Sequence, residues 1–111
     1  MTYRVMFSPE AEEQFAALYR YIAVAASPKT AESYVNSIID YCESLATFPL
    51  RGTQRDDIRP GLRITNYKGR TVIAFAVDAD KVSILGVFSV GQDYETVLQD
   101  ELTQENGTRL K

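Results

Sequence analysis

The stretch Ser27–Pro49, SPKTAESYVNSIIDYCESLATFP, carries the clearest periodic pattern in the sequence. Its apolar residues recur every three or four positions for about four turns, as they do on one face of an α-helix. These residues are Ala31, Tyr34, Val35, Ile38, Ile39, Cys42, Leu45 and Ala46. Ser27 and Pro28 form a typical helix start, an N-cap followed by proline at the first helical position. The stretch therefore predicts a long amphipathic helix that ends before Pro49.

The residues before this stretch predict a short strand and another helix. Residues 2–8 alternate, with Tyr3, Val5 and Phe7 on one side, which indicates a strand. Ser8-Pro9 repeats the helix-start signal, and the helix fades near Ala26. Its apolar stripe consists of Phe15, Leu18, Tyr19 and Ile22. Two amphipathic helices joined by a tight link should form an antiparallel hairpin.

The second half of the sequence predicts a meander of antiparallel strands. Residues 50–61 are rich in Arg, Gly, Thr, Asp and Pro, which is typical of a loop. The strand candidates after this loop are Leu62–Asn66, Arg70–Val77 and Lys81–Val90. Lys68-Gly69 and Asp78-Ala79-Asp80 supply the turns between them. Residues 93–102 are a candidate for a short final helix.

These elements predict one α+β domain in the order β-α-α-β-β-β, with a possible last α. A small antiparallel sheet of three or four strands needs cover for its apolar face, and the helical hairpin is the only cover that the pattern offers. A length of 111 residues suits a single domain. We expect this domain to span residues 1–102, followed by a polar tail, residues 103–111, that is frayed.

The composition excludes several kinds of site. The chain has no histidine, so Ser-His-Asp and Cys-His catalytic sites are ruled out. Its single cysteine, Cys42, lies on the apolar helix face and predicts a buried hydrophobe rather than a reactive thiol, a disulfide or a zinc site. Gly86 and Gly91 lack the arrangement of a nucleotide-binding loop. We expect no cofactor and no metal. Without a long apolar run, we also expect a soluble, cytoplasmic protein that does not enter membranes.

The formal net charge of −3 conceals a marked asymmetry. Residues 51–70 hold six basic and two acidic residues, a local charge of +4, and the remainder carries −7. The basic residues of this segment are Arg51, Arg55, Arg59, Arg63, Lys68 and Arg70. The segment is either a solvated edge that discourages aggregation or a docking surface for an acidic partner or phosphates. The overall acidity argues against a general nucleic-acid binder. We also expect no direct sequence-specific binding of nucleic acid.

Catalytic groupings in the sequence are weak. Asp78 and Asp80 suit a hairpin turn better than paired catalytic carboxylates, and Asp56-Asp57 suits a turn or a cap better than a metal site. Tyr21 and Tyr41 lie beside the apolar stripes and are weak interface candidates if they are exposed.

Several short phrases together resemble the ParE toxins of the ParE/RelE superfamily, over roughly residues 3–98. In the first half they are Ser8-Pro9-Glu10-Ala11, Tyr21-Ile22-Ala23 and Leu45-Ala46-Thr47-Phe48-Pro49. In the second half they are Gly52, Arg55, Gly61-Leu62-Arg63, the Gly69–Val77 strand and Val90-Gly91-Gln92-Asp93-Tyr94. Each phrase is weak alone, and their order and spacing carry the resemblance.

The resemblance implies the RelE/ParE-like fold and the toxin of a type II toxin–antitoxin module. Such a toxin is neutralised by a ParD-like antitoxin in a hetero-oligomer, and members of the ParE branch poison DNA gyrase. The groove between the helical hairpin and the sheet, with the basic segment, should receive the antitoxin's amphipathic, often acidic tail. The residues expected to contact the antitoxin or the target are Arg59, Arg63, Lys68, Arg70, Asp93 and Tyr94.

The resemblance leaves two alternatives open, a RelE-like ribosome-dependent mRNA interferase and a non-toxic relic that binds an antitoxin. Arg70 matches a sheet arginine of the ribonuclease branch, but Asp93 and Glu95 replace expected bases and no histidine is present. Since RNA cleavage needs a proton acceptor and cations, we expect no ribonuclease activity. Gly86 and Ser89 stand where many ParE chains have Arg and His, which bears on target affinity or identity rather than on fold.

Overall fold

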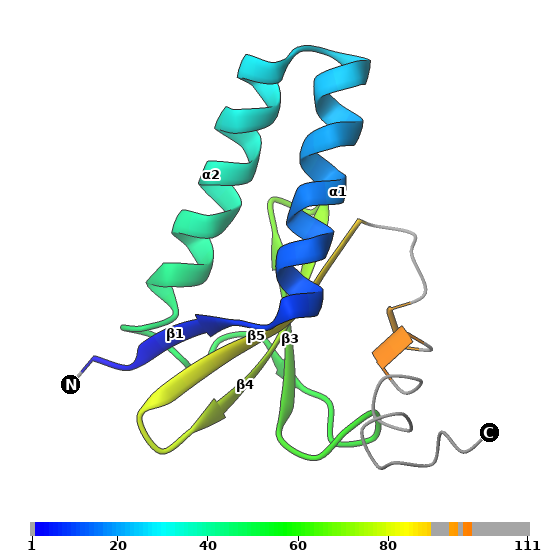
Figure 1. Ribbon diagram of the computed structural model, residues 1–111. Coiled ribbons are helices and arrows are strands. Elements are labelled where there is room, and N and C mark those ends of the chain that lie inside the picture. Colours follow the sequence, from blue (N-terminus) through cyan, green and yellow to red (C-terminus); the bar gives the residue numbers. More distant parts are fainter. Residues whose placement is uncertain (1, 90–93, 96, 99–111) are drawn as a thin grey trace.

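Two antiparallel helices cover one face of a five-stranded sheet in the computed structural model (Figure 1), which describes residues 2–89, 94, 95, 97 and 98. The elements are β1 (Arg4–Phe7), α1 (Pro9–Ala25), α2 (Pro28–Ser44), β2 (Thr53–Gln54), β3 (Leu62–Tyr67), β4 (Thr71–Asp78) and β5 (Lys81–Ser89). The predicted α+β class and the helical hairpin are confirmed. Neither helix in the described part is long and apolar enough to cross a membrane.

Both helices begin where the Ser-Pro pairs predict. The Ser8 hydroxyl accepts a hydrogen bond from the Ala11 N–H at 3.0 Å, and the Ser27 hydroxyl accepts one from the Thr30 N–H at 3.1 Å. Each serine therefore satisfies an N–H that has no partner inside its own helix.

The strand order β1-β5-β4-β3-β2 differs from a simple antiparallel meander in two ways. β1 pairs with β5 in parallel, from Arg4 opposite Lys81 to Phe7 opposite Ile84, so the expectation of a wholly antiparallel sheet is wrong at this edge. Alternation of side chains gives a strand its faces but not its direction. Within the predicted loop of residues 50–61, Thr53 and Gln54 also form a two-residue edge strand against β3.

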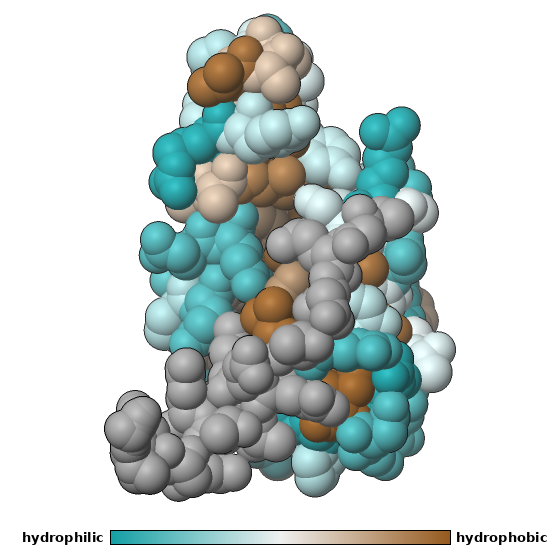
Figure 2. Space-filling view, turned by 90° about the vertical axis from the view of Figure 1, so that its right-hand side faces the viewer, coloured by the Kyte–Doolittle hydropathy of each residue, from teal (hydrophilic) through white to brown (hydrophobic). Residues whose placement is uncertain are grey.

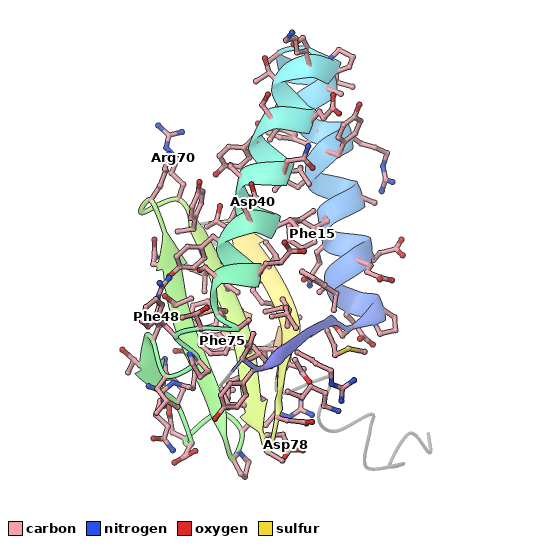
Figure 3. The ribbon with its side chains drawn as sticks, turned by 90° about the vertical axis from the view of Figure 1, so that its left-hand side faces the viewer. Phe15, Asp40, Phe48, Arg70, Phe75 and Asp78 are labelled. Carbon is pink, nitrogen blue, oxygen red and sulfur yellow. The ribbon has the colours of Figure 1, made fainter. Side chains whose placement is uncertain are left out.

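The main core fills the space between the helices and the sheet. Figure 3 shows Phe15 and Phe75 in this layer, and both are buried. The predicted face of the second helix also supplies Val35, Ile38, Cys42 and Leu45, and α1 adds Ala11, which the predicted stripe did not include. Cys42 is fully buried as predicted, and burial, followed by the nearby Glu43, raises the pKa of its thiol to about 12.

A second cluster covers the opposite face of the sheet. It consists of Ile58, Leu62, Val72, Ala74, Phe88 and Leu98. The helical hairpin is therefore not the only cover, because the loop before β3 and the residues after β5 cover the other face. The unbroken apolar run Val72–Val77 in β4 is the signal for burial on both faces.

Part of the predicted final helix is described. Tyr94, Glu95, Val97 and Leu98 have helical backbone, and Leu98 is fully buried. The rest of residues 93–102 and the predicted polar tail, residues 103–111, lie outside the described residues.

Candidate protein-docking groove

A hollow of about 400 Å³ lies between α1 and the ends of β4 and β5. Its lining residues, here called the α1 groove, are Gln14, Ala17, Leu18 and Tyr21 from α1 and Thr71, Val87, Phe88 and Ser89 from the sheet. Figure 2, which faces this side of the molecule, shows apolar surface at the tip of the helical hairpin and in the hollow below it. Tyr21 is 71% exposed, so it meets the condition that made it an interface candidate.

The groove exists because β5 continues past the end of β1. The strand pairing of β1 with β5 ends at Phe7 and Ile84, and a β-bulge follows in β5. Beyond this point α1, and no longer β1, is the neighbour of β5. The Gln14 side-chain oxygen of α1 accepts a hydrogen bond from the Val87 N–H of β5 at 2.7 Å. The helix therefore lies along the outer part of β5 and forms one wall of the groove.

Gly86 allows Phe88 to form part of the opposite wall. A Cβ atom at Gly86 would lie 2.6 Å from a ring atom of Phe88, so any side chain there would displace the ring. The Phe88 ring is buried and lies 6.1 Å from the Tyr94 ring, centroid to centroid. The unusual glycine in the last strand therefore has a packing role beside the groove.

Two predicted cations lie at the end of the sheet where Thr71 lines the groove. Arg70 directly precedes Thr71, and Figure 3 shows it projecting from the turn between β3 and β4. Lys68 and Gly69 have φ values of 55° and 68°, and the Arg70 N–H donates to the Tyr67 carbonyl at 3.1 Å. This tight turn holds Lys68 and Arg70 exposed at the end of the hairpin.

Arg59 and Arg63 lie elsewhere, so the structure does not bring the four predicted bases together. Arg59 lines a different hollow, with Lys81 and Asp78, at the opposite end of the sheet from Arg70. The Arg63 guanidinium donates to the carbonyls of Leu50 and Arg51 at 2.8 and 3.0 Å. Arg63 therefore braces the loop that precedes β2.

Tyr94 belongs to the covering of the second sheet face, whereas Asp93 lies outside the described residues. The Arg55 guanidinium donates to the Tyr94 hydroxyl at 3.4 Å, to Glu95 at 2.9 Å and to Asp57 at 2.7 Å. Sequence reasoning gave Arg55 no separate role, because its partner Glu95 is 40 positions away. Hydrogen bonding from Arg55 holds the pKa of the Asp57 carboxyl below its ordinary value.

The remaining polar candidates have structural partners. Asp56 accepts a hydrogen bond from the Gly61 N–H at 2.8 Å, and Asp78 accepts one from the Ala79 N–H at 2.9 Å, so both serve turns as predicted. Tyr41 is half-buried, and its hydroxyl is 2.9 Å from that of Thr65, so it is not an exposed contact. The described residues hold no cluster of acidic or cysteine side chains suited to a metal ion.

Comparison with known proteins gives concordant results. A family model described as the ParE toxin of the type II toxin–antitoxin system parDE matches residues 5–94. The fold is similar to a chain of the chromosomal ParDE toxin–antitoxin system from P. aeruginosa, with TM-score 0.70 and 21% identity over 80% of this chain and 97% of that chain. It is also similar to a chain of the toxin–antitoxin complex RelBE2 from Mycobacterium tuberculosis, with TM-score 0.57 and 18% identity over 80% and 99%. No curated protein sequence matches.

Proposed function

Because the chain belongs to the ParE toxin family of type II toxin–antitoxin systems, we propose that its α1 groove binds a ParD-like antitoxin and that the free toxin inhibits DNA gyrase. Both steps are binding events, and both place the toxin in the cytoplasm. The toxin and its antitoxin form a hetero-oligomer.

The groove itself is the observation that supports antitoxin binding. Its walls are mainly apolar, Tyr21 stands exposed at its edge, and Lys68 and Arg70 project from the end of the sheet that it adjoins. A partner segment with apolar side chains on one face and carboxylates beside them complements this surface. An amphipathic segment of an antitoxin has this chemistry.

The state of Arg55 favours inhibition by binding over RNA cleavage. Arg55, from the loop before β3, and Tyr94, which follows β5, bring together a cation and an aromatic hydroxyl, as a ribonuclease site would require. However, Asp57 and Glu95 already neutralise the guanidinium, so an RNA phosphate would have to displace two carboxylates. With no histidine in the chain as a proton acceptor, a RelE-like ribonuclease is the weaker candidate.

Antitoxin binding is tested by a charge placed in the groove. Tyr21→Asp should raise the Kd for the antitoxin, the product of the adjacent small reading frame, by at least about 30-fold in isothermal titration calorimetry. Val24→Asp is the matched control, because Val24 is 89% exposed on the same helix and does not line the groove. Equal effects of the two substitutions would contradict a groove site.

Gyrase inhibition is tested with the purified toxin. The toxin should reduce supercoiling by gyrase or accumulate cleaved DNA complexes, and equimolar antitoxin should reverse the effect. Unchanged gyrase at high molar excess of toxin would contradict this target. Cleavage of mRNA on programmed ribosomes would instead support the ribonuclease, and normal growth of cells that express the chain alone would support a non-toxic relic.

A further inference from the structure

The loop that follows α2 presents two large apolar side chains to solvent. Phe48 is 59% exposed and Leu50 is 68% exposed. This segment, residues 48–51, is here called the α2 loop. Exposed apolar side chains that are close together on a rigid support are typical of protein-binding surfaces.

Arg63, on β3, binds the backbone of the α2 loop. Its guanidinium donates hydrogen bonds to the carbonyls of Leu50 at 2.8 Å, Arg51 at 3.0 Å and Gly52 at 3.4 Å. Gly52, directly after the loop, has a φ of 78° and packs so closely that a Cβ would lie 2.3 Å from the Ile64 carbonyl oxygen. The backbone of the loop is therefore fixed against β3.

Arg51, within the loop, connects it to α2. Its guanidinium carbon lies 5.3 Å from the Tyr41 ring centroid and 5.2 Å from that of Phe48, and one of its nitrogens donates to the Ser44 hydroxyl at 3.2 Å. Two arginines thus support a loop whose own apolar side chains remain exposed. The arginine contacts therefore fix the position of the loop while Phe48 and Leu50 stay outside the core.

The surface combines a hollow with available positive charge. Tyr3 and Thr47 complete, with the α2 loop, a hollow of about 430 Å³ that has room for an apolar side chain. Among the described residues, neither Arg51 nor Arg63 has a carboxylate at ion-pair distance, whereas Arg55 has two. The complementary partner therefore carries an apolar anchor and a carboxylate next to it.

We infer that the α2 loop is a second attachment point for the antitoxin, separate from the α1 groove. The inference rests on the proposed function, because it takes the antitoxin as the occupant of that groove. Both surfaces select the same chemistry, apolar side chains flanked by carboxylates, so different segments of one partner satisfy both. Since the two surfaces are formed by different elements, binding at one raises the effective concentration of the partner at the other.

A substitution at Leu50 tests the inference. Leu50→Asp should raise the Kd for the antitoxin by about tenfold or more, because it places a carboxylate in the apolar hollow and next to the partner's own. Val24→Asp again serves as the control, because it adds the same charge at an exposed apolar position outside both surfaces. Hydrogen exchange on the unmodified complex provides a second measure, in which amides of the α2 loop should gain protection when the antitoxin binds.

Each outcome decides a different question. If Tyr21→Asp weakens antitoxin binding but Leu50→Asp does not, and the loop amides gain no protection, the second attachment point is excluded and the proposed function stands. If the unmodified chain does not bind the antitoxin, both are wrong. If Leu50→Asp abolishes growth arrest while antitoxin affinity is kept, the loop contacts the toxin's target and the inference is overturned.

Discussion

The guanidinium of Arg55 lies 2.9 Å from the carboxylate of Glu95, although 40 positions separate them in the sequence. The same guanidinium lies 2.7 Å from Asp57 in the loop before β3. This arrangement ties the residues after β5 to that loop, on the sheet face that the helices do not cover. Arg55 thereby closes the second cluster, in which Leu98 is fully buried.

Loss of the Arg55 guanidinium should release the residues after β5. Arg55→Gln removes both ion pairs, so amides around Leu98 should exchange faster with solvent, with little change in the helices. Hydrogen exchange followed by mass spectrometry measures this. Arg4→Gln is the control, because the Arg4–Asp80 pair is 3.8 Å long and exposed on both sides, and such pairs contribute little. Equal exchange in the two variants would contradict the role of Arg55.

Stability should fall in acid partly through Asp57. The pKa of this carboxyl is lower in the folded chain than in the unfolded chain, chiefly because Arg55 hydrogen bonds to it. Its contribution is therefore fully present above the ordinary Asp pKa of about 3.9 and disappears as the pH falls through the lower folded-state pKa. In urea unfolding between about pH 6 and pH 2, Asp57→Asn should be less stable than the original chain near pH 6. This difference should vanish at the acid end.

Gly52→Ala should destabilise the fold far more than Gly69→Ala. Both glycines have positive φ, at 78° and 68°, which costs an alanine about 1 kcal/mol. Only Gly52 also meets a backbone atom, with its Cβ position 2.3 Å from the Ile64 carbonyl oxygen. We expect Gly52→Ala to lower the free energy of unfolding by more than about 2 kcal/mol, measured by urea titration. Similar losses for both variants would show that the loop yields at Gly52.

The thiol of Cys42 should be inert in the folded protein. Its pKa of about 12 and its complete burial leave almost no accessible thiolate at about pH 8. An aromatic disulfide reagent should therefore react slowly with the native chain and rapidly in denaturant, followed by absorbance. Fast reaction of the native chain at the rate seen in denaturant would mean that the main core opens readily.

The helices could be predicted because their signals are local in the sequence. Features that depend on contacts between distant residues could not be predicted. Ser8 and Ser27 cap helices through bonds to residues three positions away, so the sequence pattern contains the whole interaction. β1 pairs in parallel with Lys81–Ile84, a segment far away in the sequence. The alternation of side chains in β1 indicates neither its partner strand nor the direction of pairing.

The site shows the same limit. The basic segment 51–70 and the groove were foreseeable, but the separate tasks of its arginines were not. Arg63 binds backbone carbonyls of the preceding loop, Arg55 binds Glu95, and Arg70 remains exposed on a turn. These roles depend on which backbone and carboxylate groups the fold brings within reach, and charge along the sequence does not carry that information.

Because β1 pairs in parallel with β5, the sheet can be completed only after nearly all of the described chain has been synthesised. β1 is translated first, yet its neighbouring strand begins only at Lys81, after both helices and three strands have been made. Pairing over such a separation closes late in folding. A chain that stops before β5 therefore lacks Val87 and Phe88, and with them one wall of the α1 groove. Under the proposed function, such an incomplete chain lacks the surface that engages the antitoxin, so antitoxin binding requires that translation has passed β5.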